Sequence, residues 1–280
     1  MPVDLHIHST ASDGTLSPAA VVSAAKDAGL DTISLCDHDS VAGVDEAIRA
    51  GTALGVSVIP GVEFSSETDD ISVHILGYFV DQNDVELGRL LCSLRDVRLN
   101  RARAIVQVLT DAGYAIRLET VLEFANGGSV GRAHVAMALV KAGYVPTMSK
   151  AFSRFLGRGK PFYVPKPVAE PEVVIATIKK AGGLAVLAHP GVSGTEHLID
   201  RLQTAGLEGI EVYHAQHSTE ERDRYAAIAL ERGLVSTGGS DFHSPGESRP
   251  QLGDGRVPEE ALVALLAAAG DRARMLRMTQ

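Results

Sequence analysis

Seven short apolar runs, rich in β-branched residues, are the feature that most limits the folds open to this chain of 280 residues. They cover residues 3–7, 32–36, 56–62, 72–79, 184–189, 209–214 and 234–239. Most are apolar almost throughout, which is typical of strands buried on both faces. Helical stretches separate several of the runs, and this alternation predicts parallel strands in an α/β fold. Seven strands exceed a small α/β unit and favour a barrel or a doubly wound sheet.

The helical stretches carry end signals of their own. Residues 17–29 have Ser17 as a candidate N-cap, Pro18 at the first helical position and Gly29 at the C-terminal end. Further helices are predicted over residues 40–55, 171–183, 194–206 and 218–233.

The alternation stops between the fourth and fifth strands. Residues from about 87 to 165 contain no convincing strand pattern and are predicted to form several helices. Residues 89–166 hold 13 Lys and Arg against 4 Asp and Glu, although the whole chain has a net charge of −9. We therefore predict a barrel-like domain of residues 1–86 and 167–280, interrupted by a helical, basic insertion subdomain of residues 87–166.

Composition excludes several classes of protein. No apolar run approaches the roughly 18–20 residues of a membrane span, and the N-terminus lacks the pattern of a secretory signal. Cys36 and Cys92 are too few for a disulfide framework or a four-thiolate zinc site, so a reducing cytoplasmic location is expected. The acidic net charge argues against stable binding to double-stranded DNA.

Histidines and carboxylates gather at the predicted strands, mostly where each strand ends. They are His6, His8, Asp37, His38, Glu63, His74, His189, His214, Asp241 and His243. Taken alone, a histidine on an apolar strand is usually a packed core residue, and an aspartate at a strand end is usually a turn residue. Seven of the ten histidines nevertheless fall here. Because barrel active sites are built at the carboxyl ends of the strands, the joint pattern predicts a metal site.

The His-x-His pair at residues 6 and 8 has a geometric reason. Residues i and i+2 of a strand point to the same face, so two imidazoles can bind one ion. A mixture of imidazole and carboxylate suits Zn, Mn or Fe better than Ca or Mg alone. The number of candidate ligands exceeds the needs of one ion, which predicts a cluster of two or three.

Several blocks of sequence, in this order, resemble the PHP (polymerase and histidinol phosphatase) superfamily. They are DLHIHSTASDGTLSP, SLCDHDSVAG, IPGVEFSSE, VHILGY, LAHPG and GGSDFHSP. The segment GGSVGRAHVAMALV in the insertion resembles the subgroup of 3′,5′-nucleoside bisphosphate phosphatases, relatives of which also trim RNA from the 5′ end. The resemblance implies a distorted seven-stranded (β/α)7 barrel, with the helical insertion covering the active site.

The resemblance also implies nine metal ligands around up to three ions. The matching positions fall into three sets: a first ion held by His6, His8, Glu63 and Asp241, a second that Glu63 shares with His74 and His189, and a third held by Asp13, His38 and His243. Asp37 is expected to orient an imidazole, and His214 to support the site, contact phosphate or serve a structural role. Manganese is the preferred metal, with Zn, Fe or Mg as alternatives.

The resemblance predicts hydrolysis of the 3′-phosphate of nucleoside 3′,5′-bisphosphates such as pAp, with AMP as a further substrate. Attack of a metal-bridging hydroxide on phosphorus is the expected chemistry. The second phosphate must be held while the first is cut, and Arg132, His134 and Ser129 are the candidates for this contact. The expected partners are therefore a small nucleotide or short RNA, and no membrane.

Other functions remain open from the sequence. A 5′–3′ exoribonuclease acting on short 5′-phosphorylated oligonucleotides would use the same site, although the absence of Trp weakens stacking along a long strand. A histidinol phosphatase would not need a basic clamp. An amidohydrolase-type deaminase usually has a metal-bridging lysine on strand four, where this chain has His74. A non-catalytic module attached to a polymerase is opposed by the complete ligand set.

Overall fold

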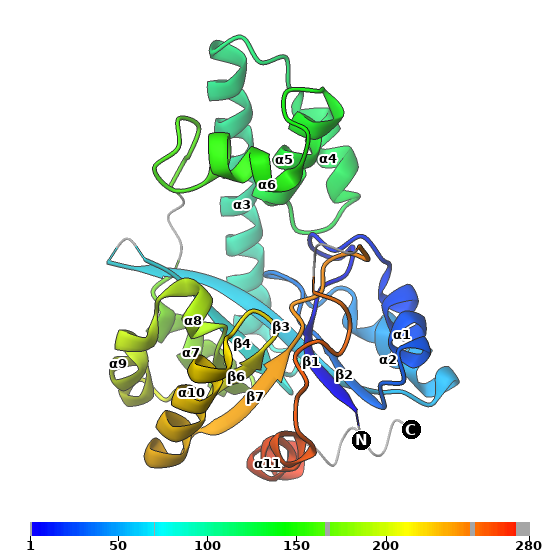
Figure 1. Ribbon diagram of the computed structural model, residues 1–280, viewed down its shortest axis with the longest axis vertical. Helices are drawn as coiled ribbons and strands as arrows, with labels where there is room; N and C mark the ends of the chain where they lie inside the picture. The colour runs from blue at the N-terminus through cyan, green and yellow to red at the C-terminus, as the bar shows by residue number, and fades with distance from the viewer. Residues whose placement is uncertain (1, 70, 166–168, 247–249, 273–280) are drawn as a thin grey trace.

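The seven predicted strands form one sheet in chain order (Figure 1). The computed structural model describes residues 2–69, 71–165, 169–246 and 250–272. The strands are β1 Val3–Ile7, β2 Thr32–Leu35, β3 Ser57–Thr68, β4 Ile71–Tyr78, β5 Leu184–Leu187, β6 Gly209–His214 and β7 Val235–Gly239. The segment after β7 returns to β1, where the His8 N–H donates to the Phe242 carbonyl at 2.9 Å. The sheet is thus a nearly closed barrel, and the predicted α/β barrel fold is confirmed.

The prediction that all the strands are parallel is wrong for β4, which runs antiparallel to both β3 and β5. Only residues 69 and 70 separate β3 from β4, and a link this short permits a hairpin but not a parallel crossover. The third predicted strand, residues 56–62, is also too short. The strand continues to Thr68 because the hairpin pairs Glu63 with Leu76 and Ser65 with His74.

Helices cover the outside of the barrel and one of its ends. They are α1 Pro18–Asp27, α2 Val44–Leu54, α7 Pro171–Lys180, α8 Pro190–Ser193, the 3-10 helix η2 Glu196–Leu198, α9 Ile199–Thr204, α10 Thr219–Arg232 and α11 Glu259–Ala269. The Ser17 side chain accepts from the Ala20 N–H at 3.2 Å, as an N-cap should. Leu262 and Leu265 of α11 pack against the barrel interior, so α11 covers the end opposite the carboxyl ends of the parallel strands (Figure 1).

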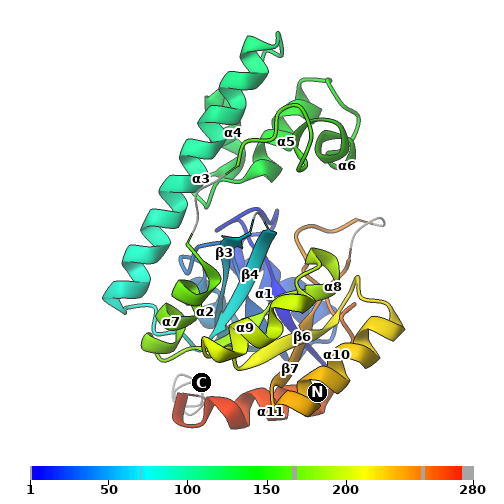
Figure 2. The same ribbon diagram turned by 90° about the vertical axis from the view of Figure 1, so that its left-hand side faces the viewer.

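The segment between β4 and α7 is helical and has an apolar core of its own. Its helices are α3 Val85–Asp111, α4 Leu118–Ala125, α5 Arg132–Lys141, α6 Met148–Ala151 and the π-helix η1 Phe152–Leu156. In Figure 2, α3 runs along the barrel and beyond it, and α4, α5 and α6 lie above the carboxyl ends of the parallel strands. No helix in the described part of the chain is long and apolar enough to span a membrane.

The core of this helical segment gives a stability prediction. Leu139 of α5 is fully buried in it, whereas Leu122 of α4 is 39% exposed. Leu139→Ala leaves a cavity and should lower the free energy of unfolding by about 2–5 kcal/mol. The matched change Leu122→Ala should cost only about 0.5 kcal/mol. Urea denaturation of the two variants measures both values, and equal losses would contradict the assignment of this core.

Candidate metal centre

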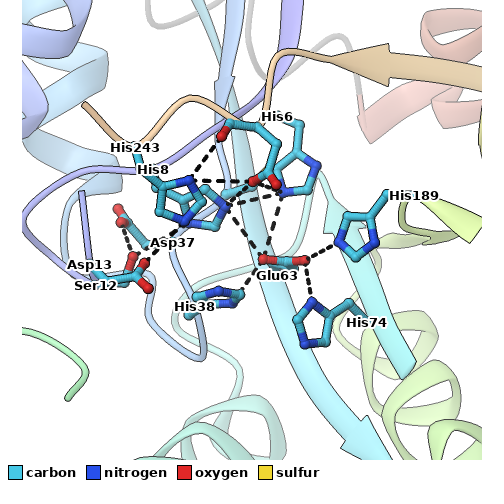
Figure 3. Close-up of polar contacts among 12 residues, drawn as sticks. His6, His8, Ser12, Asp13, Asp37, His38, Glu63, His74, His189 and His243 are labelled. Carbon is cyan, nitrogen blue, oxygen red and sulfur yellow. Dashed lines mark hydrogen bonds and ion pairs between the residues drawn. The ribbon is translucent and has the colours of Figure 1, made fainter. Parts of the chain in front are cut away.

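The Glu63 carboxylate lies at the centre of a group of histidines (Figure 3). It comes from β3 and is buried. Its Oε1 atom is 2.8 Å from His74 Nδ1 and 3.0 Å from His189 Nε2. Its Oε2 atom faces His38 Nδ1 at 2.8 Å, His8 Nε2 at 3.4 Å and His6 Nε2 at 3.6 Å. The two oxygens therefore face different sets of imidazoles, as a carboxylate shared between two ions would.

Two aspartates complete the cluster. Asp241 Oδ1 lies 3.1 Å from His8 Nε2 and 3.5 Å from His6 Nε2. Asp13 Oδ1 lies 3.4 Å from His243 Nε2. All nine predicted ligand positions therefore belong to one connected group of side chains.

The potential ligand atoms fall into three sets, each with all its atoms within 4.8 Å of one another. The sets are His6, His8 and Asp241; His8, Asp13, His38 and His243; and His38, Glu63 and His74. The first two resemble the predicted first and third sets, except that Glu63 is missing from the first and His8 also joins the third. In the remaining set His38 stands beside Glu63 and His74, where His189 was expected. The assignment of individual ligands to ions stays a prediction.

The donor atoms suit divalent cations. Asp13 Oδ1, His38 Nδ1 and Glu63 Oε2 are buried, and their close contacts within the cluster do not have the geometry of a hydrogen bond to a described residue. Buried polar atoms are normally satisfied, so atoms left in this state indicate space for a ligand. Two backbone segments are strained in support of the cluster, since His189 has φ of 30° and Asp241 has φ of 55°. Non-glycine residues in this region are common at functional sites.

The carboxylates and imidazoles of the cluster shift one another's pKa values. Burial raises the pKa of Glu63, but the charges of His38 and His74 outweigh it and hold that pKa well below the usual range. Burial lowers the pKa of His38 to about 4, against the opposing effect of Glu63. At neutral pH the carboxylate is therefore charged and the His38 imidazole is neutral, the forms that bind metals. Nearby carboxylates instead outweigh burial and raise the pKa of His6, and that of His243 to about 10, so metal binding must displace a proton from each of these two rings.

Asp37 holds the loop that carries Asp13. Its carboxylate accepts the Ser9 N–H at 2.8 Å, the Ser9 hydroxyl at 2.6 Å and the Ser12 hydroxyl at 2.6 Å. No hydrogen bond from an imidazole to Asp37 is found within the described ranges. Its action on the histidines is indirect, because Ser12 Oγ lies 3.5 Å from His8 Nδ1.

Strand β6 brings two buried residues to the cluster. His214 accepts the Gln216 N–H on Nδ1 at 3.2 Å and places Nε2 3.7 Å from Asp241 Oδ2. Glu211, which the sequence analysis missed, is fully buried, and its Oε1 lies 3.0 Å from His6 Nδ1. Burial raises the pKa of Glu211, but the charges of His6 and His214 outweigh it and lower the pKa to about 2. The sequence could have pointed to Glu211, because a charged residue inside the apolar run GIEVYH is unusual.

A cavity of about 290 Å³ lies between the cluster and the helical segment. Asp13, His38 and His74 line it from the barrel. The cations that line it from the helical segment are Arg98, Arg101, Arg132 and Arg158. The cavity therefore joins candidate metal ligands to a concentrated positive charge.

Two of these arginines are without a carboxylate partner in the described part of the chain. Arg101 Nε donates to the Val164 carbonyl at 2.7 Å, and Arg132 Nη1 donates to the Leu156 carbonyl at 3.3 Å. Burial lowers the pKa of Arg101 to about 10, and the neighbouring Arg132 adds to this. Both remain charged at neutral pH, so the cavity can attract an anion.

Ser129 and His134, predicted with Arg132 to contact phosphate, do not line this cavity. The Ser129 N–H donates to the Ala11 carbonyl at 3.0 Å. His134 Nδ1 accepts the Gly131 N–H at 3.0 Å and so caps the start of α5. In this structure both residues shape the wall behind Arg132.

Comparison with known proteins gives consistent matches. Residues 4–156 match the PHP domain family. A 3′,5′-nucleoside bisphosphate phosphatase of Chromobacterium violaceum is 38% identical over 257 residues, with 90% of each chain covered. A 5′-3′ exoribonuclease of Haemophilus influenzae is 38% identical over 247 residues, covering 86% of this chain and 90% of its own. A crystal structure from Bifidobacterium adolescentis, assigned as a metal-dependent phosphoesterase, has a TM-score of 0.88 at 32% identity, with 95% of each chain covered. The resemblance seen in the sequence motifs is therefore confirmed, and this chain belongs to the PHP domain family.

Proposed function

We propose that the chain hydrolyses the 3′-phosphate of nucleoside 3′,5′-bisphosphates. The observation that carries the proposal is the shared cavity, in which the cluster around Glu63 faces Arg101 and Arg132. One phosphate would be cut at the cluster, and the other would be held by the arginines. The identity of 38% to a phosphatase of this name supports the substrate class.

The reaction class, without regard to the specific substrate, is that of a metal-dependent phosphatase, in agreement with the PHP relatives. We propose that the nine side chains of the cluster hold two or three ions, with Mn preferred over Zn, Fe or Mg. Divalent ions bound there would activate water and neutralise the charge of the phosphate that is attacked. The protein's own part is to hold imidazoles and carboxylates at fixed positions, with Asp37 and His214 as supports.

The arginines select and orient the substrate. Arg132 stands over the Phe152 ring at 5.6 Å and donates to Leu156 O, so its guanidinium is fixed before substrate arrives. A fixed planar guanidinium can bind phosphate oxygens through two donors. We propose that Arg132, with Arg101 beside it, binds the 5′-phosphate. Histidinol phosphate has a single phosphate and would leave these charges unpaired, so it fits the cavity less well.

The second candidate is 5′–3′ exoribonuclease activity on short 5′-phosphorylated oligonucleotides. It is favoured by the 38% identity to an enzyme of that name. Both functions would use the same cluster and the same arginines. We also propose that the chain is divided into a barrel of residues 1–86 and 167–280 and a covering insertion of residues 87–166. We propose that the protein works in the cytoplasm.

Substrate identity can be decided by measuring product release from pAp, AMP, histidinol phosphate and a 5′-phosphorylated dinucleotide, each with Mn, Mg or Zn. We expect pAp with Mn to give the highest kcat/KM. A higher kcat/KM for the dinucleotide would favour the exoribonuclease instead.

The metal role can be tested with His8→Ala, which removes a donor shared by two of the three sets of ligand atoms. We expect fewer bound ions per chain by elemental analysis and loss of nearly all turnover, with an unchanged circular dichroism spectrum. His197→Ala removes an exposed histidine and is the matched control. Full activity of metal-free His8→Ala protein would refute the proposed site.

The phosphate clamp can be tested with Arg132→Ala. Loss of a charged hydrogen-bonding partner costs about 1.5–3 kcal/mol, so the KM for pAp should rise about 10- to 100-fold. A generic ester with a single phosphate should be affected much less. Arg103→Ala, an exposed arginine on α3, is the control for general loss of positive charge. Equal losses on both substrates would remove Arg132 from the clamp.

A further inference from the structure

We infer that Glu211 is a positioning residue that fixes two candidate ligands from two different strands, the ring of His6 and the backbone of His189. It lies on β6, a strand that contributes none of the nine predicted ligands. Its side chain is fully buried and does not line the cavity, so it is placed to act on the ligands and not on substrate. The inference rests on the proposed metal site.

The first contact determines which nitrogen of His6 carries the proton. Glu211 Oε1 lies 3.0 Å from His6 Nδ1. A charged carboxylate is only an acceptor, so Nδ1 must carry the hydrogen. When the ring is neutral, as a metal ligand must be, the free lone pair is on Nε2, which lies 3.2 Å from His8 Nε2 and 3.5 Å from Asp241 Oδ1. Glu211 thus directs the metal-binding nitrogen of His6 into the cluster.

The second contact holds the turn that presents His189. Glu211 Oε2 accepts the His189 N–H at 2.8 Å. This residue has the left-handed backbone conformation, with φ of 30°, which a non-glycine residue keeps only when its surroundings fix it. The held backbone brings His189 Nε2 to 3.0 Å from Glu63 Oε1. One carboxylate on β6 therefore contacts two candidate ligands: His6, which lies on β1, and His189, which follows β5.

Replacement by glutamine separates this role from packing. Gln has nearly the same shape, but it offers only one acceptor oxygen and puts an NH₂ donor where the second oxygen was. If the amide oxygen keeps the His189 N–H, the NH₂ group faces His6 Nδ1. The ring must then accept on Nδ1 and carry its proton on Nε2, which points into the cluster. Loss of such supporting contacts typically weakens metal binding by about 10- to 100-fold.

Tyr78→Phe is the matched control. Tyr78 is fully buried in the same barrel, and its hydroxyl donates to the Leu5 carbonyl at 2.9 Å. Removing this hydroxyl also deletes one buried hydrogen bond with little change of shape. The lost bond, however, does not involve a candidate metal ligand. It reports the effect of general barrel destabilisation on metal affinity.

The experiment compares metal-stripped wild type, Glu211→Gln and Tyr78→Phe. Competition with a chelator measures Mn²⁺ and Zn²⁺ affinity. Because nearby carboxylates outweigh burial and raise the pKa of His6, imidazole ¹⁵N NMR of the metal-free protein is recorded at a pH high enough to make this ring neutral, where it identifies the His6 tautomer. We expect about 10- to 100-fold weaker binding and a changed His6 tautomer in Glu211→Gln only. Wild-type affinity and tautomer in Glu211→Gln, or equal weakening in Tyr78→Phe, would overturn the inference.

Two further outcomes distinguish failure of the inference about Glu211 from failure of the proposed function. Wild-type protein that takes up no metal would refute the metal site, while the metal-free NMR comparison would still test the action of Glu211 on His6. If Glu211→Gln does not fold, Glu211→Asp takes its place. It keeps both acceptor oxygens but draws them back by one methylene, so we expect the wild-type tautomer with weakened affinity. Unchanged affinity in a folded Glu211→Asp protein would overturn the inference.

Discussion

The buried Glu63 carboxylate is the interaction on which the site depends. A charge removed from water is costly unless it is paired, and here imidazoles from several parts of the barrel surround it. Those imidazoles are carried by β1 and β4 and by the segments after β1, β2 and β5. They reach one carboxylate only when the strands are in register. The strand register that closes the barrel is therefore the same register that assembles the site.

The reversed direction of β4 explains the length of α3. Because β4 runs antiparallel to its neighbours, it ends at Tyr78 on the side of the barrel away from the cluster. The chain must then return past the whole barrel before it can cover the site. A helix of 27 residues spans about 40 Å, enough to rise along the barrel and extend beyond it, as Figure 2 shows. The hairpin of β3 and β4 thus makes the covering position of α4 to α6 possible.

The sequence predicted what local patterns encode. Apolar runs located all seven strands, and the spacing of His6 and His8 placed two imidazoles on one face. The direction of β4 was missed because periodicity carries no information about direction. The predicted strands over residues 56–62 and 72–79 also left nine residues between them, whereas the structure leaves only two. The link between Glu211 and His6 joins residues 205 positions apart, and the contact of Asp37 with Ser9 joins residues 28 apart. Such pairings follow from tertiary register and leave little trace in one sequence.

The basic helices and the acidic barrel are joined at the site itself. Arg98 of α3 is paired with Asp39, which directly follows His38, and donates to Ser65 Oγ at 2.6 Å. Asp39 Oδ1 in turn accepts the Ser65 N–H at 2.8 Å, two residues beyond Glu63. Buried ion pairs are lost at a high cost when one partner moves, so this contact fixes α3 relative to both ligands. Arg101 lies one turn further along the same helix and faces the cavity. The distance between the candidate metal ligands and the anion-binding arginines is therefore set by a rigid helix anchored beside the metal ligands.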